Sequence, residues 1–143
     1  EAQVEQVTKT VIDLSPKQRS KQANKYHAEG LKLYRKKQYD LSLAQIRKAL
    51  ELNPTHPGIV NDYGFILYRN KQYGDALFWL EKTIELDAKR IPVYLNIADT
   101  LVALKKLQEA VPYYRYYLEL YPESPVKERV EEFLKANSEA NAA

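Results

Sequence analysis

The feature of this sequence that most constrains its fold is a residue pattern that returns every 34 positions, three times in register. Five columns follow that spacing: Gly30, Gly64 and Ala98; Tyr39, Tyr73 and Leu107; Ser42, Ala76 and Ala110; Ile46, Leu80 and Tyr114; and Leu52, Leu86 and Leu120. A fixed period of this size is typical of chains built from stacked units, none of which can bury its apolar side alone. The sequence therefore predicts a repeat protein whose units share one continuous surface.

Within each unit the apolar residues follow a helical period. In the first unit Tyr26, Gly30 and Leu33 fall at i, i+4 and i+7, and the period resumes at Tyr39 after a polar break. Prolines cluster between the units, where they end one helix or begin the next. The polar breaks are residues 36–38, 70–72 and 104–106. We therefore expect three helix pairs, over residues 23–56, 57–90 and 91–124.

The two ends of the chain differ from the repeats. Residues 1–22 form an N-terminal extension, in which Val4, Val7, Val11 and Leu14 have a 3-4-3 spacing. Such a stripe fits a short helix that lies on the first repeat, or a helix that joins two copies of the chain. Ser15-Pro16 would cap a second start, so we expect the first helix of repeat one to extend back to about residue 16. At the other end residues 125–136 predict a helix that caps the stack, followed by a tail over 137–143.

Composition narrows the function classes. The chain of 143 residues has no cysteine, two histidines and no apolar run near the ~20 residues that span a bilayer. It lacks methionine, so we expect either a trimmed form of a longer chain or a mature protein whose leader was removed; a bacterial exported protein and a cytoplasmic one both fit. Residues 15–50 carry ten Lys/Arg and two acids, but these bases scatter around their helices, which predicts a solvated surface and no nucleic-acid partner.

The column pattern resembles the tetratricopeptide repeat. The residues that carry the resemblance are Tyr26 and Tyr94 at the first aromatic position, Gly30 and Gly64, Ala49, Ala76 and Ala110 at the small positions, and Pro54 and Pro122 at the closing proline. Departures are Glu29, Val60, Ala88 and Tyr117. The resemblance implies an all-α, right-handed superhelical solenoid of antiparallel helix pairs, with the first helix of each pair lining a concave groove that binds segments of other proteins.

No constellation of residues predicts an enzyme. The four glycines are isolated, which excludes a phosphate-binding loop, and neighbouring carboxylates such as Glu131 and Glu132 fall on a charged helix face. His56 lies in a turn between units. We expect no catalytic residue, no metal site and no cofactor.

The candidate site is the face of the first helices, one step beyond the core stripe. Its residues are His27, Leu31, Tyr34 and Arg35 in the first unit, Asn61, Phe65, Tyr68 and Arg69 in the second, and Leu95, Asp99 and Val102 in the third. A plain solvated face would be rich in Lys and Glu, whereas exposed apolar groups beside Tyr and Arg are typical of binding sites. The alternative is that the N-terminal helix or packing between repeats buries these residues.

The expected function is therefore that of a protein-interaction scaffold or adaptor with a peptide or protein partner. Some tetratricopeptide domains hold a chaperone's C-terminal carboxylate with Lys, Asn and Arg side chains. The corresponding positions here are His27, Leu31, Asp62, Pro92 and Asn96, and none matches. The alternative function is self-assembly into a homo-oligomer, through the N-terminal helix or through oppositely charged ends of the repeats.

Overall fold

The computed structural model describes residues 14–141. This part of the chain forms α-helices and no strand. The helices are α2 (Pro16–Arg35), α3 (Tyr39–Leu52), α4 (Pro57–Arg69), α5 (Tyr73–Leu86), α6 (Ile91–Ala103), α7 (Leu107–Leu120) and α8 (Lys127–Asn141). The all-α fold class predicted from the sequence is confirmed.

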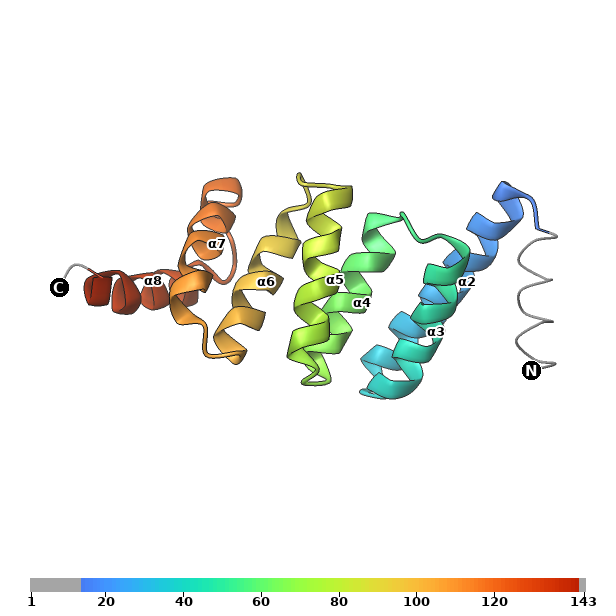
Figure 1. The fold of residues 1–143 in the computed structure, drawn as a ribbon, viewed down its shortest axis with the longest axis horizontal. Helices are drawn as coiled ribbons and strands as arrows, with labels where there is room; N and C mark the ends of the chain where they lie inside the picture. Colours follow the sequence, from blue (N-terminus) through green and yellow to red (C-terminus); the bar gives the residue numbers. More distant parts are fainter. Residues whose placement is uncertain (1–13, 142–143) are drawn as a thin grey trace.

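The helices form three antiparallel pairs that stack in series (Figure 1). The contacts are densest within the pairs α2–α3, α4–α5 and α6–α7, and each pair packs on the next through α3–α4 and α5–α6. α8 packs on α7 and closes the far end of the stack. In the view of Figure 1, α3 and α5 lie in front of α2 and α4. The arrangement is a helical solenoid.

The glycine column allows the two helices of a pair to approach closely. A Cβ atom at Gly30 would lie 2.4 Å from Ile46 Cγ1, and one at Gly64 would lie 2.9 Å from Leu80 Cγ. The buried Ser42 hydroxyl donates a hydrogen bond of 2.6 Å to the Gly30 carbonyl oxygen, which ties the helices together at this point. The small residues predicted at these columns are therefore required by the packing of the helices.

The turns inside the three pairs share one conformation. Lys37, Lys71 and Lys105 have φ angles of 61°, 63° and 62°, in the left-handed region. The Lys37 N–H donates to Tyr34 O and the Gln38 N–H to Leu33 O, and the other two turns repeat both hydrogen bonds. This is the Schellman helix ending, in which glycine is the residue usually found at the left-handed position. The sequence predicted the turns but gave no sign of their left-handed lysines.

The N-terminal end of the described stack begins as predicted. Ser15 caps α2, since its side chain accepts from the Gln18 N–H while the Gln18 side chain accepts from the Ser15 N–H, and Pro16 occupies the first turn. Leu14 is half-buried against the core. The stripe formed by Val4, Val7 and Val11 lies outside the described residues.

The outer side of the first pair is polar. Lys25 and Glu29 are exposed there, whereas the residues 34 positions later, Ile59 and Tyr63, are buried against α3. Glu29 departs from the repeat pattern because no preceding pair covers it within the described residues.

The C-terminal helix differs from the prediction at both ends. It begins at Lys127, two residues later than predicted, because the Ser124 hydroxyl accepts from the Val126 N–H and holds residues 125–126 in a turn. It continues to Asn141, so residues 137–141, which the sequence assigned to a tail, are helical. The prediction of a capping helix over 125–136 was therefore too short.

Among the helices described, none is both long and apolar enough to cross a membrane.

Candidate partner-binding face

The first helices of the pairs contact one another directly and form one face, which we call the first-helix face (α2, α4 and α6). Tyr34 on α2 meets Phe65 on α4 with the ring centroids 5.6 Å apart. α4 and α6 also pack on each other. All but one of the residues predicted for the site belong to this face as half-buried or exposed groups; the exception is Asn61.

Five rings make a continuous ladder, which we call the aromatic strip, along the edge of this face; three lie on α2 and α4, and the other two begin α3 and α5. Its members in order of contact are Tyr39, Tyr34, Phe65, Tyr68 and Tyr73. The successive centroid distances are 5.7, 5.6, 6.4 and 5.7 Å, within the range of favourable ring pairs. All five are half-buried, so each presents only part of its ring to solvent. Four of them pack against the first core cluster, and Tyr73 contacts Tyr68 at the end of the strip. The strip is thus a partly exposed aromatic surface supported by the core.

The remaining apolar residues of the predicted site flank the strip. Leu31 is half-buried against the first core cluster, and Leu95 and Val102 are half-buried against the second. Packing against the core therefore covers these side chains in part and leaves the rest of each exposed.

Polar side chains on the same helices pair with one another. His27 Nε2 lies 2.6 Å from Asp62 Oδ2 and bridges α2 to α4. Asn61 was predicted as a site residue, but its side chain is buried, with 6% of the residue exposed, and its Oδ1 accepts from Asn96 Nδ2 at 3.4 Å. Asn61 therefore serves the packing between α4 and α6 and offers little surface to a partner.

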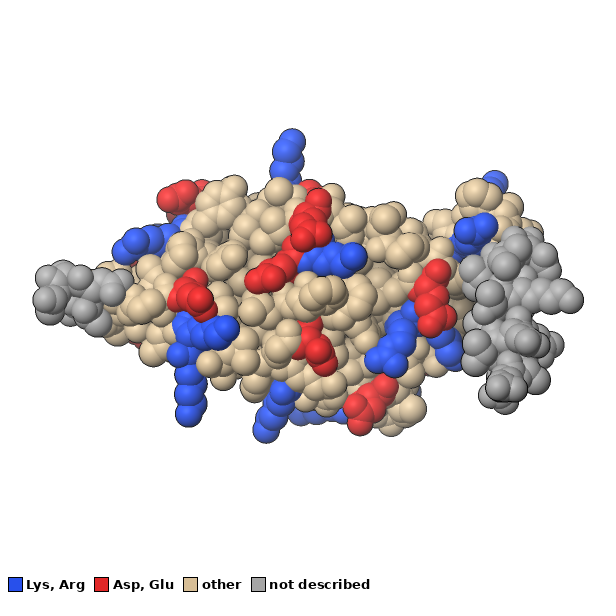
Figure 2. Space-filling model, in the orientation of Figure 1, with Lys and Arg blue, Asp and Glu red and all other residues tan. Residues whose placement is uncertain are grey.

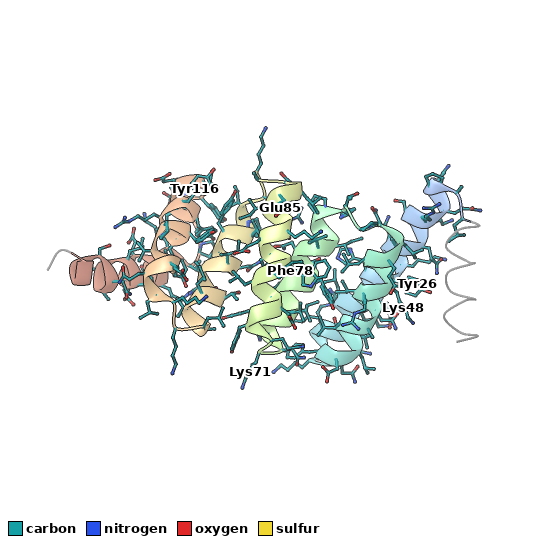
Figure 3. The ribbon with its side chains drawn as sticks, viewed as in Figure 1. Tyr26, Lys48, Lys71, Phe78, Glu85 and Tyr116 are labelled. Atoms are coloured by element: carbon teal, nitrogen blue, oxygen red, sulfur yellow. The ribbon has the colours of Figure 1, made fainter. Side chains whose placement is uncertain are left out.

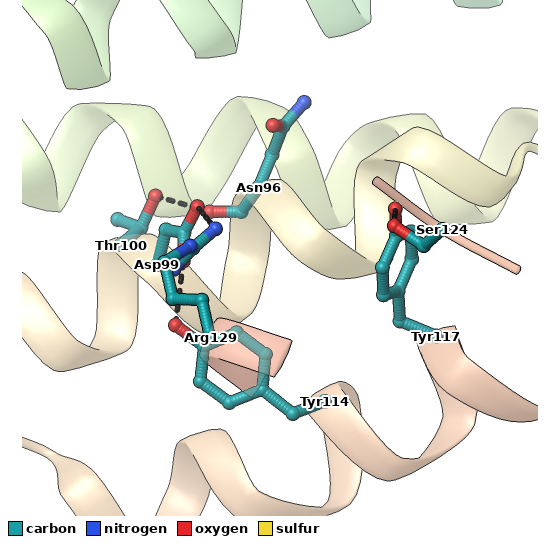
Figure 4. Close-up of polar contacts among 7 residues, drawn as sticks. All are labelled: Asn96, Asp99, Thr100, Tyr114, Tyr117, Ser124 and Arg129. Carbon is teal, nitrogen blue, oxygen red and sulfur yellow. Dashed lines mark hydrogen bonds and ion pairs between the residues drawn. The ribbon is translucent and has the colours of Figure 1, made fainter. Parts of the chain in front are cut away.

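Asp99 is also engaged within the protein (Figure 4). Its carboxylate accepts from the Tyr114 hydroxyl at 2.5 Å and from both terminal nitrogens of Arg129, at 2.9 and 3.3 Å. Burial, together with the hydrogen bond to Asp99, raises the pKa of Tyr114. The hydrogen bond to Asp99 also raises the pKa of Arg129. Asp99 joins α6, α7 and α8 and is not a free acid.

The two predicted arginines lie at the edge of the strip. Arg35 and Arg69 are both exposed at the last residues of α2 and α4. Hydrogen bonding to Tyr39 raises the pKa of Arg69, and the nearby Tyr34 adds to the effect. Burial raises the pKa of Tyr68, and the charge of Asp99 adds to it. Cationic charge therefore borders neutral aromatic surface.

Sequence reasoning missed three residues of this face. Tyr39 and Tyr73 were recognised as a repeat column but not as the two ends of the strip. Arg129 falls 34 positions after Leu95, so the column spacing could have identified it as the same position on a fourth first helix. α8 thus continues the face beyond the third repeat.

The opposite face, formed by α3, α5 and α7, is shown in Figures 2 and 3. Charged side chains are scattered over it with uncharged surface between them. Phe78 on α5 is 59% exposed and Tyr116 on α7 is 42% exposed. Each ring packs edge-on against one neighbour, Trp79 and Tyr94 respectively. This face has exposed rings, but they do not form a ladder like the aromatic strip.

Within residues 14–141 no group of three or more His, Asp or Glu side chains is placed to hold a metal ion.

Stacked helix pairs, glycine contacts at a fixed spacing and a shared first-helix face define the class of helical-repeat proteins. Family profiles described as tetratricopeptide repeat match residues 26–56, 46–78 and 91–124. The chain belongs to the tetratricopeptide repeat family.

The fold is similar to solved tetratricopeptide domains. The first tetratricopeptide domain of Spaghetti (RPAP3) bound to the HSP90 peptide SRMEEVD has a TM-score of 0.77 at 23% identity, over 87% of this chain and 96% of that one. The Arabidopsis OM64 domain has a TM-score of 0.78 at 19% identity, over 82% and 98%. The TPR2B domain of yeast Sti1 in complex with an Hsp70 peptide has a TM-score of 0.74 at 15% identity, over 85% and 99%. No curated protein matches the sequence.

Proposed function

We propose that this protein is a non-enzymatic interaction module that holds an extended or helical segment of a partner protein on the first-helix face. The observation that carries the proposal is the aromatic strip, which is continuous, partly exposed and bordered by Arg35 and Arg69. Tyr and Arg are among the residues most enriched at binding hot spots, and Tyr offers a large contact area with little loss of side-chain freedom.

The similar structures support the general function. Two of them, RPAP3 and the Sti1 domain, are described as complexes with chaperone peptides. A solenoid of helix pairs presents the same kind of extended face, on which a peptide can contact several repeats at once. We infer that binding of a protein segment is the activity of this chain as well.

The ligand class differs from a chaperone's C-terminal carboxylate. The central position of such a site is Asp62, which carries a carboxylate of its own and is already bound to His27 at 2.6 Å. A second carboxylate placed beside Asp62 would be repelled. Leu31 and Pro92 offer no hydrogen-bond donor from their side chains. The proposed ligand is therefore an internal segment rich in apolar or aromatic residues.

Binding of a partner to matched variants tests the proposal. The partner is identified by capture from the native organism and then used as a purified protein in calorimetry. Tyr34→Ala/Tyr68→Ala removes two rings of the strip, and we expect it to weaken binding about tenfold or more. Because both rings are half-buried, the melting temperature of each variant is measured alongside.

The matched control is Phe78→Ala/Tyr116→Ala, which removes two exposed rings from the opposite face. A second test variant, Leu31→Gln/Leu95→Gln, removes apolar surface from the first-helix face, adds no charge and keeps every ring of the strip. We expect both first-helix variants to lose affinity and the control to keep it. Equal affinity of all three variants for the partner would refute the proposal.

A further inference from the structure

The turns inside the three helix pairs lie along one edge of the solenoid, the lower edge in Figure 1. With the ends of the helices beside them, residues 35–40, 69–75 and 103–109 carry seven Lys/Arg and three Asp/Glu. We call the seven bases the basic rim; they are Arg35, Lys36, Lys37, Arg69, Lys71, Lys105 and Lys106. All seven are exposed.

On the opposite edge, the ends of the second helices and the turns between pairs carry more acids than bases. Residues 51–56, 85–90 and 119–124, at the ends of the second helices and the turns between pairs, carry five Asp/Glu and two Lys/Arg. Figure 3 shows one member of each set, with Lys71 at the lower end of α5 and Glu85 at its upper end. One column of each set recurs every 34 residues: Lys37, Lys71 and Lys105 on one side, and Glu51, Glu85 and Glu119 on the other. The two sets of turns therefore differ in charge, and the start of α2 adds Lys17, Arg19 and Lys21 to the upper edge of the first pair.

The acids of the lower edge lie at helix starts, and the rim lysines lie just after helix ends, where positive charge is also favoured by the helix dipole. Asp40, Asp75 and Glu109 lie in the first turns of α3, α5 and α7, where negative charge is favoured by the helix dipole. Asp40 also accepts from Asn70 Nδ2 at 3.0 Å. Within residues 14–141 no lysine of the rim forms an ion pair.

Three lysines of the rim have an uncommon backbone conformation. Lys37, Lys71 and Lys105 occupy the left-handed position of each turn, with φ between 61° and 63°, where glycine is favoured. The same unfavourable choice in all three turns is a local strain that folding does not require, and strain of this kind often accompanies function. The charge of these side chains is the property that glycine would not supply.

The basic rim borders the aromatic strip. Tyr34 and Tyr68 immediately precede Arg35 and Arg69, and Tyr39 and Tyr73 begin the helices that follow Lys37 and Lys71. A ligand segment that lies on the strip therefore passes beside the rim over at least two repeats. A shallow depression at the rim, lined by Lys37, Gln38, Tyr39, Asp40, Leu41 and Asn70, brings charge and an exposed leucine together.

We propose that the partner segment is acidic as well as apolar, with Asp or Glu side chains directed to the basic rim while its apolar side chains pack on the aromatic strip. This inference rests on the proposed function and specifies the ligand of the same site. Opposite charges along one edge favour a single lateral placement of the segment on the strip and accelerate its association.

Three fluorescent 12-residue peptides test the inference: one alternates Asp with Phe and Leu, the second has Asn and the third Lys in place of Asp. Their binding to the full chain is measured by fluorescence polarisation at low and at physiological salt. We expect the Asp peptide to bind more tightly than the Asn peptide, and the Lys peptide to bind most weakly. The advantage of the Asp peptide shrinks as salt rises, because the rim is exposed.

The test variant is Lys37→Gly/Lys71→Gly/Lys105→Gly, which removes three charges and relaxes the three turns, so that loss of folding cannot explain a loss of binding. The control, Lys25→Gln/Lys89→Gln/Lys135→Gln, removes three exposed charges away from the rim. We expect the glycine variant to bind the Asp peptide about tenfold more weakly and the Asn peptide unchanged, and the glutamine control to bind both like the parent.

Each other outcome overturns the inference. Equal affinities of the parent for the Asp and Asn peptides would remove the role of the rim and leave the proposed function intact, whereas no binding of any peptide would count against both. Single-stranded oligodeoxythymidine and phosphatidylserine vesicles are measured in parallel. If the glycine variant loses affinity for either of these but keeps it for the Asp peptide, the rim binds phosphate groups and not an acidic segment.

Discussion

Arg129 on the last helix binds Asp99 on the first helix of the third repeat through two hydrogen bonds, of 2.9 and 3.3 Å. Asp99 lies on the side of the first-helix face where a fourth repeat would follow. Arg129 is 34 residues after Leu95, so it takes the place of a residue on the first helix of a fourth repeat. The capping helix thereby fixes its own register on the stack, in addition to covering apolar surface.

Arg129→Ala tests this role. Only 18% of the Asp99 side chain is exposed, so loss of Arg129 leaves a half-buried carboxylate with the Tyr114 hydroxyl as its remaining partner. The Arg129 side chain is 52% exposed, and solvent screening reduces the effect. We expect a loss of about 0.5–2 kcal/mol in the free energy of unfolding, measured by urea denaturation. Arg115→Ala, which removes an exposed hydrogen bond between α7 and α8, should cost less than about 0.5 kcal/mol.

Gly30→Ala should destabilise the first helix pair. The added Cβ would meet Ile46 Cγ1 at 2.4 Å and the backbone oxygen of Ser42 at 3.2 Å, so the helices must separate or Ile46 must move. We expect a loss of about 1–3 kcal/mol, larger than the gain in helix propensity. Gly74→Ala is the control, because nothing lies within 4 Å of its added Cβ. It should leave stability unchanged or raise it by up to about 1 kcal/mol; equal losses for both variants would contradict the packing account.

Lys71→Gly should stabilise the protein. Its φ of 63° is unfavourable for a side chain and free of strain for glycine. The relief of about 1–2 kcal/mol is offset in part by the greater freedom of glycine in the unfolded chain, so we expect a net gain of about 0.5–1 kcal/mol. Lys36→Gly in the equivalent turn of the first repeat is the control, because its φ is −86°. A gain at Lys36 and none at Lys71 would be inconsistent with left-handed strain.

Stability should fall at alkaline pH, in part because of Tyr114. Burial and the hydrogen bond to Asp99 raise the folded-state pKa of Tyr114 above its unfolded value near 10. Its contribution is therefore fully present below about pH 10 and is lost as pH rises from there through the folded pKa, since the unfolded chain releases the proton first. Tyr114→Phe should be less stable at neutral pH and show a shallower decline above about pH 10 in urea denaturation. An unchanged slope would mean that Tyr114 does not contribute to the decline.

The repeats could be predicted from the sequence because each column has one dominant physical cause. Gly30 and Gly64 mark contacts between helices that exclude a side chain, and Pro16 and Pro57 mark helix starts. These constraints are local or recur every 34 residues, so they are visible without an alignment. The length of α8 was harder to predict, since the sequence after Ala136 has neither an apolar period nor a breaking residue.

The candidate site was predicted less completely. The column spacing identified Tyr34, Phe65 and Tyr68, but it could not show that Asn61 turns into the packing between α4 and α6. It also could not show that Asp99 is bound by Arg129 from a different element. Both outcomes depend on pairs of polar groups that are distant in sequence, and no periodic pattern reports such pairs.

The most direct test of the proposed function maps the ligand onto the protein by NMR. A uniformly 15N-labelled chain is titrated with the segment of the captured partner that binds it, and backbone amide shifts are followed. We predict the largest changes around Leu31, Tyr34, Phe65 and Tyr68 on the first-helix face, with small changes around Phe78 and Tyr116. Changes concentrated on α5 and α7, with the first-helix face unaffected, would contradict the account.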